Sequence, residues 1–180
     1  MKLIMINGPT GVGKTTLAKK LHEVMPMSFL IDLDEQRRFI SHYREYKKES
    51  GKLSFDVALA ILEVCMKNGY DYIIGKGILA AGPYIHDKNL IEKFAKIGKK
   101  YKAEIYEIFL WADKEVTYKR MQKRGFKHKP NTPRDKLNEN YKLEEITKDK
   151  RTKAFVIDSN DLTANEVFKK ACGIVEISNK

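Results

Sequence analysis

One short run near the start of the chain has the residue types and spacing of a phosphate-binding loop. Residues 8–15 read GPTGVGKT and match the pattern G-x-x-x-x-G-K-[ST]. Glycines let backbone N–H groups turn inward toward a phosphate, and a side chain at Gly13 would obstruct that approach. Lys14 would place its ammonium on the terminal phosphates, and Thr15 offers a hydroxyl ligand to Mg²⁺. The residues expected to contact a nucleoside triphosphate, ATP with Mg²⁺, are Gly8, Thr10, Gly11, Val12, Gly13, Lys14, Thr15 and Thr16.

A pair of carboxylates follows the second apolar run of the chain, in the sequence FLIDLDEQRR at residues 29–38. Side chains alternate along an extended segment, so Asp32 and Asp34 are predicted to share one side of it. Asp34 is also suited to cap a helix that begins there. Arg37 and Arg38 come one helical turn later and fit either an anion clamp or a solvated helix face.

A basic segment in the second half of the chain contains two arginines at helical spacing. Arg120 and Arg124 are four residues apart, which places both guanidinium groups on one face of a helix. A proline-containing stretch with no periodicity follows at residues 126–134. A cationic segment that closes over a phosphate chain would neutralise charge and exclude water, whereas a solvated helix face is the simpler alternative.

Short apolar runs that suit buried parallel strands alternate along the chain with patterns of helical spacing. We expect strands at residues 2–7, 28–33, 70–74, 103–110 and 154–157. We expect helices at residues 14–25, 34–43, 55–68 (capped by Ser54), 87–101, 113–123 and 135–147, and after the capping box Thr163-x-x-Glu166. This alternation predicts an α/β fold with a parallel sheet covered by helices on both faces.

An N-terminal strand that runs into Gly8–Thr15, within a five-strand α/β chain of 180 residues, resembles the small P-loop kinases. That group includes the shikimate, gluconate, nucleoside-monophosphate and chloramphenicol kinases and the polynucleotide kinase domains. The resemblance implies one domain over residues 1–180, with the three-layer P-loop NTPase fold, strand order 2-3-1-4-5 and a small lid around residues 120–140. It also implies transfer of the γ-phosphate of ATP to a hydroxyl of a small molecule, such as a nucleoside, nucleotide, sugar acid or antibiotic.

The same resemblance suggests roles for individual side chains. Asp32 would help to hold Mg²⁺ through water, and Asp34 would orient the acceptor hydroxyl or accept its proton. Arg120 would stack near the adenine, and Arg124 would reach the phosphates. The loop at residues 157–162, after the fifth strand, would border the adenine, mostly through its backbone.

The end of the third strand departs from the pattern of many of these kinases, which carry an aspartate there. In this chain Ile74 is followed by Gly75 and Lys76, and the nearest carboxylate, Asp71, stands at the beginning of the strand. Ligand sites in such sheets lie at the carboxyl ends of the strands. The metal role would therefore pass to Asp32, or catalysis would be inefficient, and Lys76 is a candidate contact to the acceptor.

The net charge of +11 is concentrated in one part of the chain, since residues 96–153 hold 18 basic and 9 acidic residues. Basic surfaces suit nucleic acid, anionic membranes or phosphates. Because the excess surrounds the expected lid, it supports a phosphate-handling enzyme more than a polynucleotide partner. Two alternatives stay open, a 5′-hydroxyl polynucleotide kinase and a non-catalytic nucleotide-dependent binding module.

The two cysteines, Cys65 and Cys172, form no CxxC pair and fall in apolar helical patterns, which predicts buried thiols rather than a metal site. The opening apolar run is too short for a signal peptide, and no stretch approaches the roughly 20 apolar residues of a membrane span. We therefore expect a cytoplasmic protein, monomeric or homodimeric, with no membrane association and a small-molecule acceptor as its partner.

Overall fold

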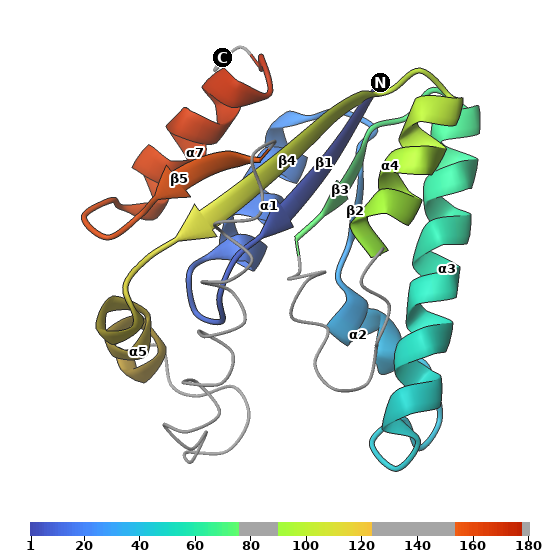
Figure 1. Cartoon of the computed structure of the whole chain (residues 1–180), viewed down its shortest axis with the longest axis horizontal. Coiled ribbons are helices and arrows are strands. Elements are labelled where there is room, and N and C mark those ends of the chain that lie inside the picture. The colour runs from blue at the N-terminus through green and yellow to red at the C-terminus, as the bar shows by residue number, and fades with distance from the viewer. Residues whose placement is uncertain (76–89, 124–153, 178–180) are drawn as a thin grey trace.

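Five parallel strands form the centre of the molecule, and in the computed structural model their order across the sheet is β2-β3-β1-β4-β5 (Figure 1). The structure describes residues 1–75, 90–123 and 154–177. Within these ranges the strands are β1 (Lys2–Asn7), β2 (Phe29–Ile31), β3 (Tyr72–Ile74), β4 (Glu104–Trp111) and β5 (Phe155–Asp158). The predicted strand order is confirmed, and β1 has the predicted bounds.

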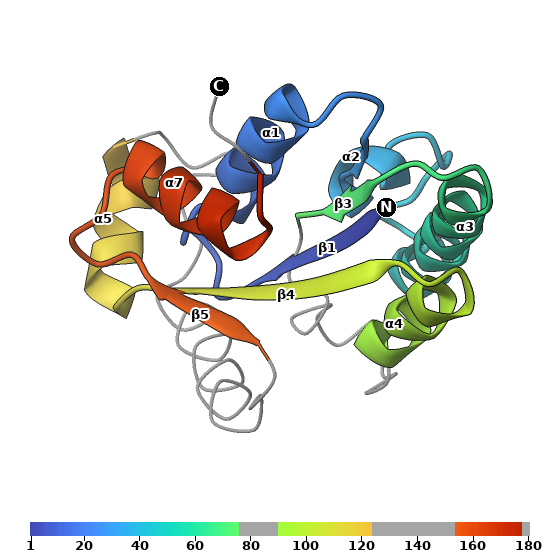
Figure 2. The same ribbon diagram turned by 90° about the horizontal axis from the view of Figure 1, so that it is seen from above.

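Helices cover both faces of this sheet, as the view in Figure 2 shows. Helices α1 and α7 pack on one face, and α3 and α4 pack on the other. The described helices are α1 (Lys14–Val24), α2 (Leu33–Arg37), α3 (Lys47–Lys67), α4 (Leu90–Lys100), α5 (Lys114–Lys123) and α7 (Ala164–Ile174). The predicted helix at 135–147 and most of the predicted lid lie outside the described residues.

The central strand β1 contributes to the hydrophobic core on both faces, as its uninterrupted apolar sequence predicts. Leu3 and Met5 pack with α3 and α4, whereas Ile4 and Ile6 pack with α1 and α7. The predicted burial of both thiols is also confirmed, and burial raises the pKa of Cys65 and Cys172. Nearly complete burial of β1 fixes the point at which the loop after Asn7 leaves the sheet.

The segment between β2 and β3 differs from the prediction at both of its helices. Helix α2 begins one residue before Asp34 and ends at Arg37, and α3 begins at Lys47 rather than after Ser54. The polar stretch 47–52 lies outside both predicted helices, but it forms the first turns of α3, with Gly51 buried. Just after it, the buried Ser54 hydroxyl donates to the Leu33 carbonyl at 3.3 Å. Packing of α3 against α2 therefore outweighs the weak local helix preference of this stretch.

Candidate functional site

The phosphate-binding loop leaves the carboxyl end of β1 and passes very close to β4. A β-carbon at Gly8 would collide with the Leu110 carbonyl, and the φ of Gly8 is +131°. Only glycine tolerates both the close approach and this backbone conformation. On the other side of the loop, a β-carbon at Gly11 would lie 3.0 Å from the Met121 side chain of α5. These contacts fix the loop between the sheet and α5.

The amino end of α1 is open to an anion. Gly13 caps the helix with a left-handed φ of +112°, and a β-carbon added there would have no heavy atom within 4 Å. The first turn of α1 carries no acidic side chain. The side chains of Thr15 and Thr16 at this turn are exposed. The helix dipole and the N–H groups of this turn are therefore available to a phosphate, which supports the expected nucleotide site.

The ammonium of Lys14 folds back over the loop from which it comes. Its Nζ donates to the Gly8 carbonyl at 2.7 Å and to the Pro9 carbonyl at 2.8 Å. These two bonds hold the positive charge against the carbonyls of the phosphate-binding loop. A strongly charged donor that is already placed needs little reorganisation to contact a phosphate oxygen.

Asp32, and not Asp34, is the residue that caps α2. The Asp32 carboxylate accepts from the N–H groups of Asp34 and Glu35, at 2.9 and 3.4 Å. The expected cap at Asp34 is wrong, and so is the extended geometry that would align the two aspartates, because the strand ends at Ile31 and the helix has begun by Leu33. Capping at the earlier aspartate places Asp34 in the first turn of α2, where its side chain is exposed.

The register of the sheet brings Asp32 to the side of the phosphate-binding loop. Ile31 of β2 pairs with Ile74 of β3, so Asp32 and Gly75 occupy the next positions on neighbouring strands. A β-carbon at Gly75 would collide with Ala18 of α1 and would lie 3.4 Å from the Lys14 carbonyl. Asp32 is therefore separated from the backbone of Lys14 by a single strand. At the opposite end of β3, Asp71 accepts from the Lys2 N–H at 2.6 Å, far from the loop, as predicted.

Arg120 holds the loop that follows β5. Its guanidinium donates to the Ser159 carbonyl at 2.6 Å and to the Ser159 hydroxyl at 3.2 Å, with further bonds to the Asn160 and Leu162 carbonyls. Arg120 also lines a cavity of about 220 Å³ together with Val12, Gly13 and Val167. Arg120 is thus bonded to the backbone of the 157–162 loop, and its expected stacking near an adenine stays a prediction.

The other cationic residues singled out from the sequence are placed differently. Arg37 donates to the Ser50 hydroxyl at 3.2 Å and lies over the Tyr43 ring, which ties α2 to the start of α3. Arg38 forms an exposed ion pair with Glu35 at 2.7 Å. Neither contact is that of an anion clamp. Arg124 and Lys76 lie outside the described residues.

The residues at this edge of the sheet could bind Mg²⁺ only together with the phosphates of a nucleotide. Among residues 1–75, 90–123 and 154–177, no cluster of three or more His, Cys, Asp or Glu side chains could hold a metal ion. Mg²⁺ commonly keeps several waters and uses substrate phosphates with one or two protein oxygens. The Thr15 hydroxyl and the Asp32 carboxylate are oxygens of that kind, so the donor set fits a nucleotide-borne Mg²⁺.

Sequence reasoning missed two polar groups at this end of the fold. Asn7, the last residue of β1, is fully buried and donates to the Glu107 carboxylate at 3.3 Å. Gln36 turns its side chain beneath α2, beside Ser54. Polar residues in a short apolar run, and in a helix of five residues, give no periodic signal from which their burial could be read.

Comparison with known proteins supports the architecture over nearly the whole chain. A model of the AAA domain family matches residues 3–142. The structure is similar to the tunicamycin resistance protein of Deinococcus radiodurans, with a TM-score of 0.62 and 21% identity, covering 98% of this chain and 96% of that one. It is also similar to a gluconokinase from Sinorhizobium meliloti 1021, with a TM-score of 0.65 and 16% identity, covering 97% of this chain and 92% of that one. A third similar structure is the shikimate kinase of Bacteroides thetaiotaomicron, with a TM-score of 0.64 and 18% identity, covering 97% of this chain and 98% of that one. These likenesses confirm the expected P-loop fold.

No curated protein sequence matches the chain. Within the part of the chain that the structure describes, none of the helices combines the length and the hydrophobicity needed to span a bilayer.

Proposed function

The chain belongs to the AAA domain family, and we propose that it is an ATP-dependent phosphotransferase that moves the γ-phosphate to a hydroxyl of a small molecule. The observation that carries this proposal is the loop at residues 8–15. It presents an open helix terminus at Gly13 and a lysine ammonium held above the loop carbonyls. Both features suit the β- and γ-phosphates of a nucleotide.

The nucleoside would occupy the cavity between the loop, α5 and the 159–162 segment. Its walls include Val12, Leu162 and Val167, which suit the face of a base, and Arg120 at one side. We propose that Arg120 sets the position of the segment that borders the adenine, since its hydrogen bonds go to the backbone of that segment. Arg124 keeps its proposed role as a phosphate contact.

The reaction exchanges one phosphorus–oxygen bond for another. The acceptor oxygen attacks the γ-phosphorus in line, the bond to the bridging oxygen of ADP breaks, and the hydroxyl proton passes to a carboxylate. We propose that Asp34 receives this proton and that Lys14 stabilises the charge that moves onto the leaving phosphate. Mg²⁺, held by Thr15 and through water by Asp32, would neutralise charge on the phosphate oxygens.

Binding of ATP with Mg²⁺, measured by calorimetry, tests the premise of the proposal. A folded protein without measurable ATP binding would refute it. A screen with γ-labelled ATP against nucleosides, sugar acids, aromatic alcohols and 5′-hydroxyl oligonucleotides then tests the transfer. We expect labelled product from a small alcohol; product from the oligonucleotides alone would refute the proposed acceptor class in favour of polynucleotide kinase activity.

A further inference from the structure

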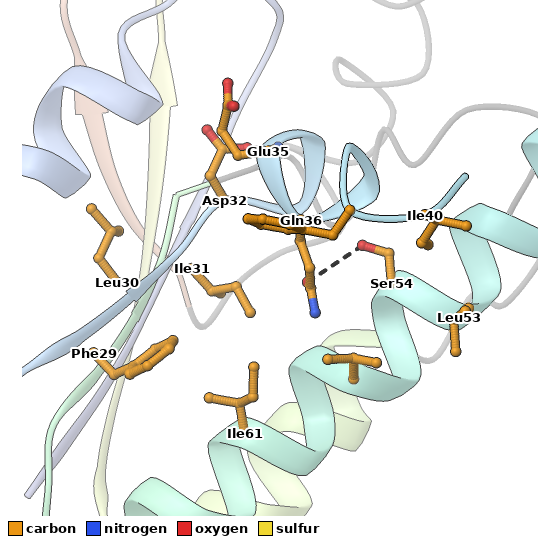
Figure 3. A pocket seen from close by; sticks show the side chains of 12 residues that line it. Phe29, Leu30, Ile31, Asp32, Glu35, Gln36, Ile40, Leu53, Ser54 and Ile61 are labelled. Atoms are coloured by element: carbon orange, nitrogen blue, oxygen red, sulfur yellow. Dashed lines mark hydrogen bonds between the residues drawn. The ribbon is translucent and has the colours of Figure 1, made fainter. Parts of the chain in front are cut away.

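A second cavity lies beneath α2, between the edge strand β2 and helix α3 (Figure 3). Its volume is about 460 Å³, which is within the range of small-molecule sites. The walls are mostly apolar and come from all three sides, with Phe29 on β2, Ile40 after α2, and Val57 and Ile61 on α3. A cavity of this size and composition suits a rigid apolar group.

One polar side chain, Gln36, forms part of the wall of this apolar cavity. The Gln36 amide oxygen accepts from the Ser54 hydroxyl at 3.4 Å, and Figure 3 shows the amide nitrogen at the end of the side chain, between β2 and α3. Among the described residues the Gln36 Nε2 is buried and has no hydrogen-bond partner. An unpaired buried donor is unfavourable, and a ligand oxygen that meets the nitrogen after a rotation of the amide would remove the penalty. The cavity is therefore built for a molecule that carries one hydrogen-bond acceptor in an apolar body.

The charges around the cavity select against an anion. The ionisable side chains that line it are the carboxylates of Asp32 and Glu35, which Figure 3 shows together at its upper end. No lysine or arginine is among the described residues of the lining. Arg38, nearby in sequence, is paired with Glu35 at the surface. A phosphate or carboxylate group in this cavity would meet repulsion and no cation, whereas a neutral or cationic molecule would not.

Asp32 links the cavity to the edge of the sheet at which phosphoryl transfer is proposed. Asp32 belongs both to the cavity lining and to the sheet edge beside Gly75, where an added β-carbon would lie 3.4 Å from the Lys14 carbonyl. A molecule that fills the cavity as far as Asp32 therefore reaches the carboxyl edge of the sheet, with only β3 between it and the backbone of Lys14.

We propose that this cavity binds the apolar body of the phosphoryl acceptor, a neutral or cationic alcohol with an oxygen that accepts a hydrogen bond from Gln36. The inference rests on the proposed function and narrows its acceptor class. It favours an aromatic or aliphatic alcohol with a carbonyl or ether oxygen over a nucleotide or a sugar acid.

Calorimetry of the full-length protein with three related probes tests the chemistry of the cavity. N-(2-hydroxyethyl)-2-naphthamide has an apolar body, a carbonyl and a primary hydroxyl; 2-(2-naphthyl)ethanol lacks the carbonyl; the 6-carboxy derivative of the naphthamide adds a negative charge. We expect saturable binding of the naphthamide and at least about tenfold weaker binding of the carboxylated derivative. Equal affinity for these two probes would overturn the proposal.

Three variants locate the binding. Gln36→Leu should weaken the naphthamide about five- to tenfold, the value of one hydrogen bond, and should leave naphthylethanol within about twofold. Val57→Asp should abolish binding of both probes, whereas Val64→Asp, on the same helix but outside the cavity lining, should not change it. Both valines are substantially exposed, at 38% and 61%, so the two variants are expected to unfold at similar temperatures. Equal effects of Val57→Asp and Val64→Asp on binding would overturn the assignment.

Transfer of label from ATP to the naphthamide completes the test. It also distinguishes a wrong acceptor class from a wrong assignment of kinase activity. Label on a sugar acid or nucleotide, without binding of the naphthamide, would overturn the acceptor class and leave the kinase activity intact. Binding of the naphthamide with no transfer to any acceptor would overturn the proposed activity, and with it the role of the cavity as an acceptor site. If sedimentation showed a dimer that Val57→Asp dissociates, while no probe binds, the cavity would be a contact between copies of the chain and the proposal would be refuted.

Discussion

Gly13→Ala separates the effect of a backbone strain from the effect of a blocked phosphate site. The φ of Gly13 is +112°, and a β-carbon there would meet no protein atom within 4 Å. The folded state should therefore lose only the strain of a non-glycine residue at positive φ, about 1–2 kcal/mol, or about 2–8 °C in Tm for a chain of this length. The methyl group would nevertheless occupy the space in which a phosphate must approach the N–H groups, so nucleotide binding should be lost.

Gly69→Ala is the matched control, because Gly69 also has a positive φ, +80°, and open space around its missing β-carbon, but it follows α3 far from the loop. Thermal unfolding of both variants and of the unmodified protein, with and without ATP and Mg²⁺, gives the comparison. At a ligand concentration of about 100 Kd, binding adds about 2.7 kcal/mol, or about 5–10 °C. We expect this increase for the unmodified protein and for Gly69→Ala, but not for Gly13→Ala. An equal increase in all three would refute the assignment of the phosphate site to the amino end of α1.

Further predictions concern the charged groups and one helix cap. Lys14→Ala should lower the rate of phosphoryl transfer about 10²- to 10³-fold, as measured by turnover at saturating ATP; an unchanged turnover would reject its role. Asp32→Asn should keep the α2 cap, and so the Tm, because asparagine caps helices as well as aspartate. The Mg²⁺ concentration needed for half-maximal rate should rise; a lower Tm with an unchanged Mg²⁺ requirement would make Asp32 purely structural. Arg120→Ala should raise the KM for ATP more than it lowers kcat, since it frees the 159–162 segment; steady-state kinetics decide this. Thr163→Ala should cost about 1 kcal/mol in urea unfolding. Hydrogen bonds from Thr163 lower the pKa of Glu166. The stability that this pair adds should therefore be present at neutral pH and lost as the pH falls through the folded-state pKa of the glutamate. The difference in unfolding free energy between Thr163→Ala and the unmodified protein should shrink over the same range.

The sheet and the phosphate-binding loop could be predicted from the sequence because their signals are local. The apolar run at Lys2–Asn7 ends directly at the glycine-rich motif, and the structure places the strand at those residues. The capping box of Thr163 and Glu166 was readable from two residue types at a fixed spacing, and both of its reciprocal hydrogen bonds are present.

The region from Asp32 to Ser54 could not be predicted in the same way, since its structure depends on contacts between elements. Asp32 and Asp34 are equally good caps by type, and the choice between them follows from where β2 ends at Ile31. The long α3 includes Gly51 because burial against α2 compensates for a poor helix former. The cavity beneath α2 arises from these same contacts, so the orientation of the Gln36 amide has no counterpart in the sequence pattern.

The close approach of Gly75 and Ala18 makes the order of substitutions matter for any variant that gains an aspartate at the end of β3. With Ala18 in place, every side chain at position 75 meets the β-carbon on α1, so Gly75→Asp alone should be defective in folding. After Ala18→Gly the same change becomes sterically accessible. The two positions are therefore epistatic, and a strand-end carboxylate can be reached from this sequence by mutation of the helix first and the strand second.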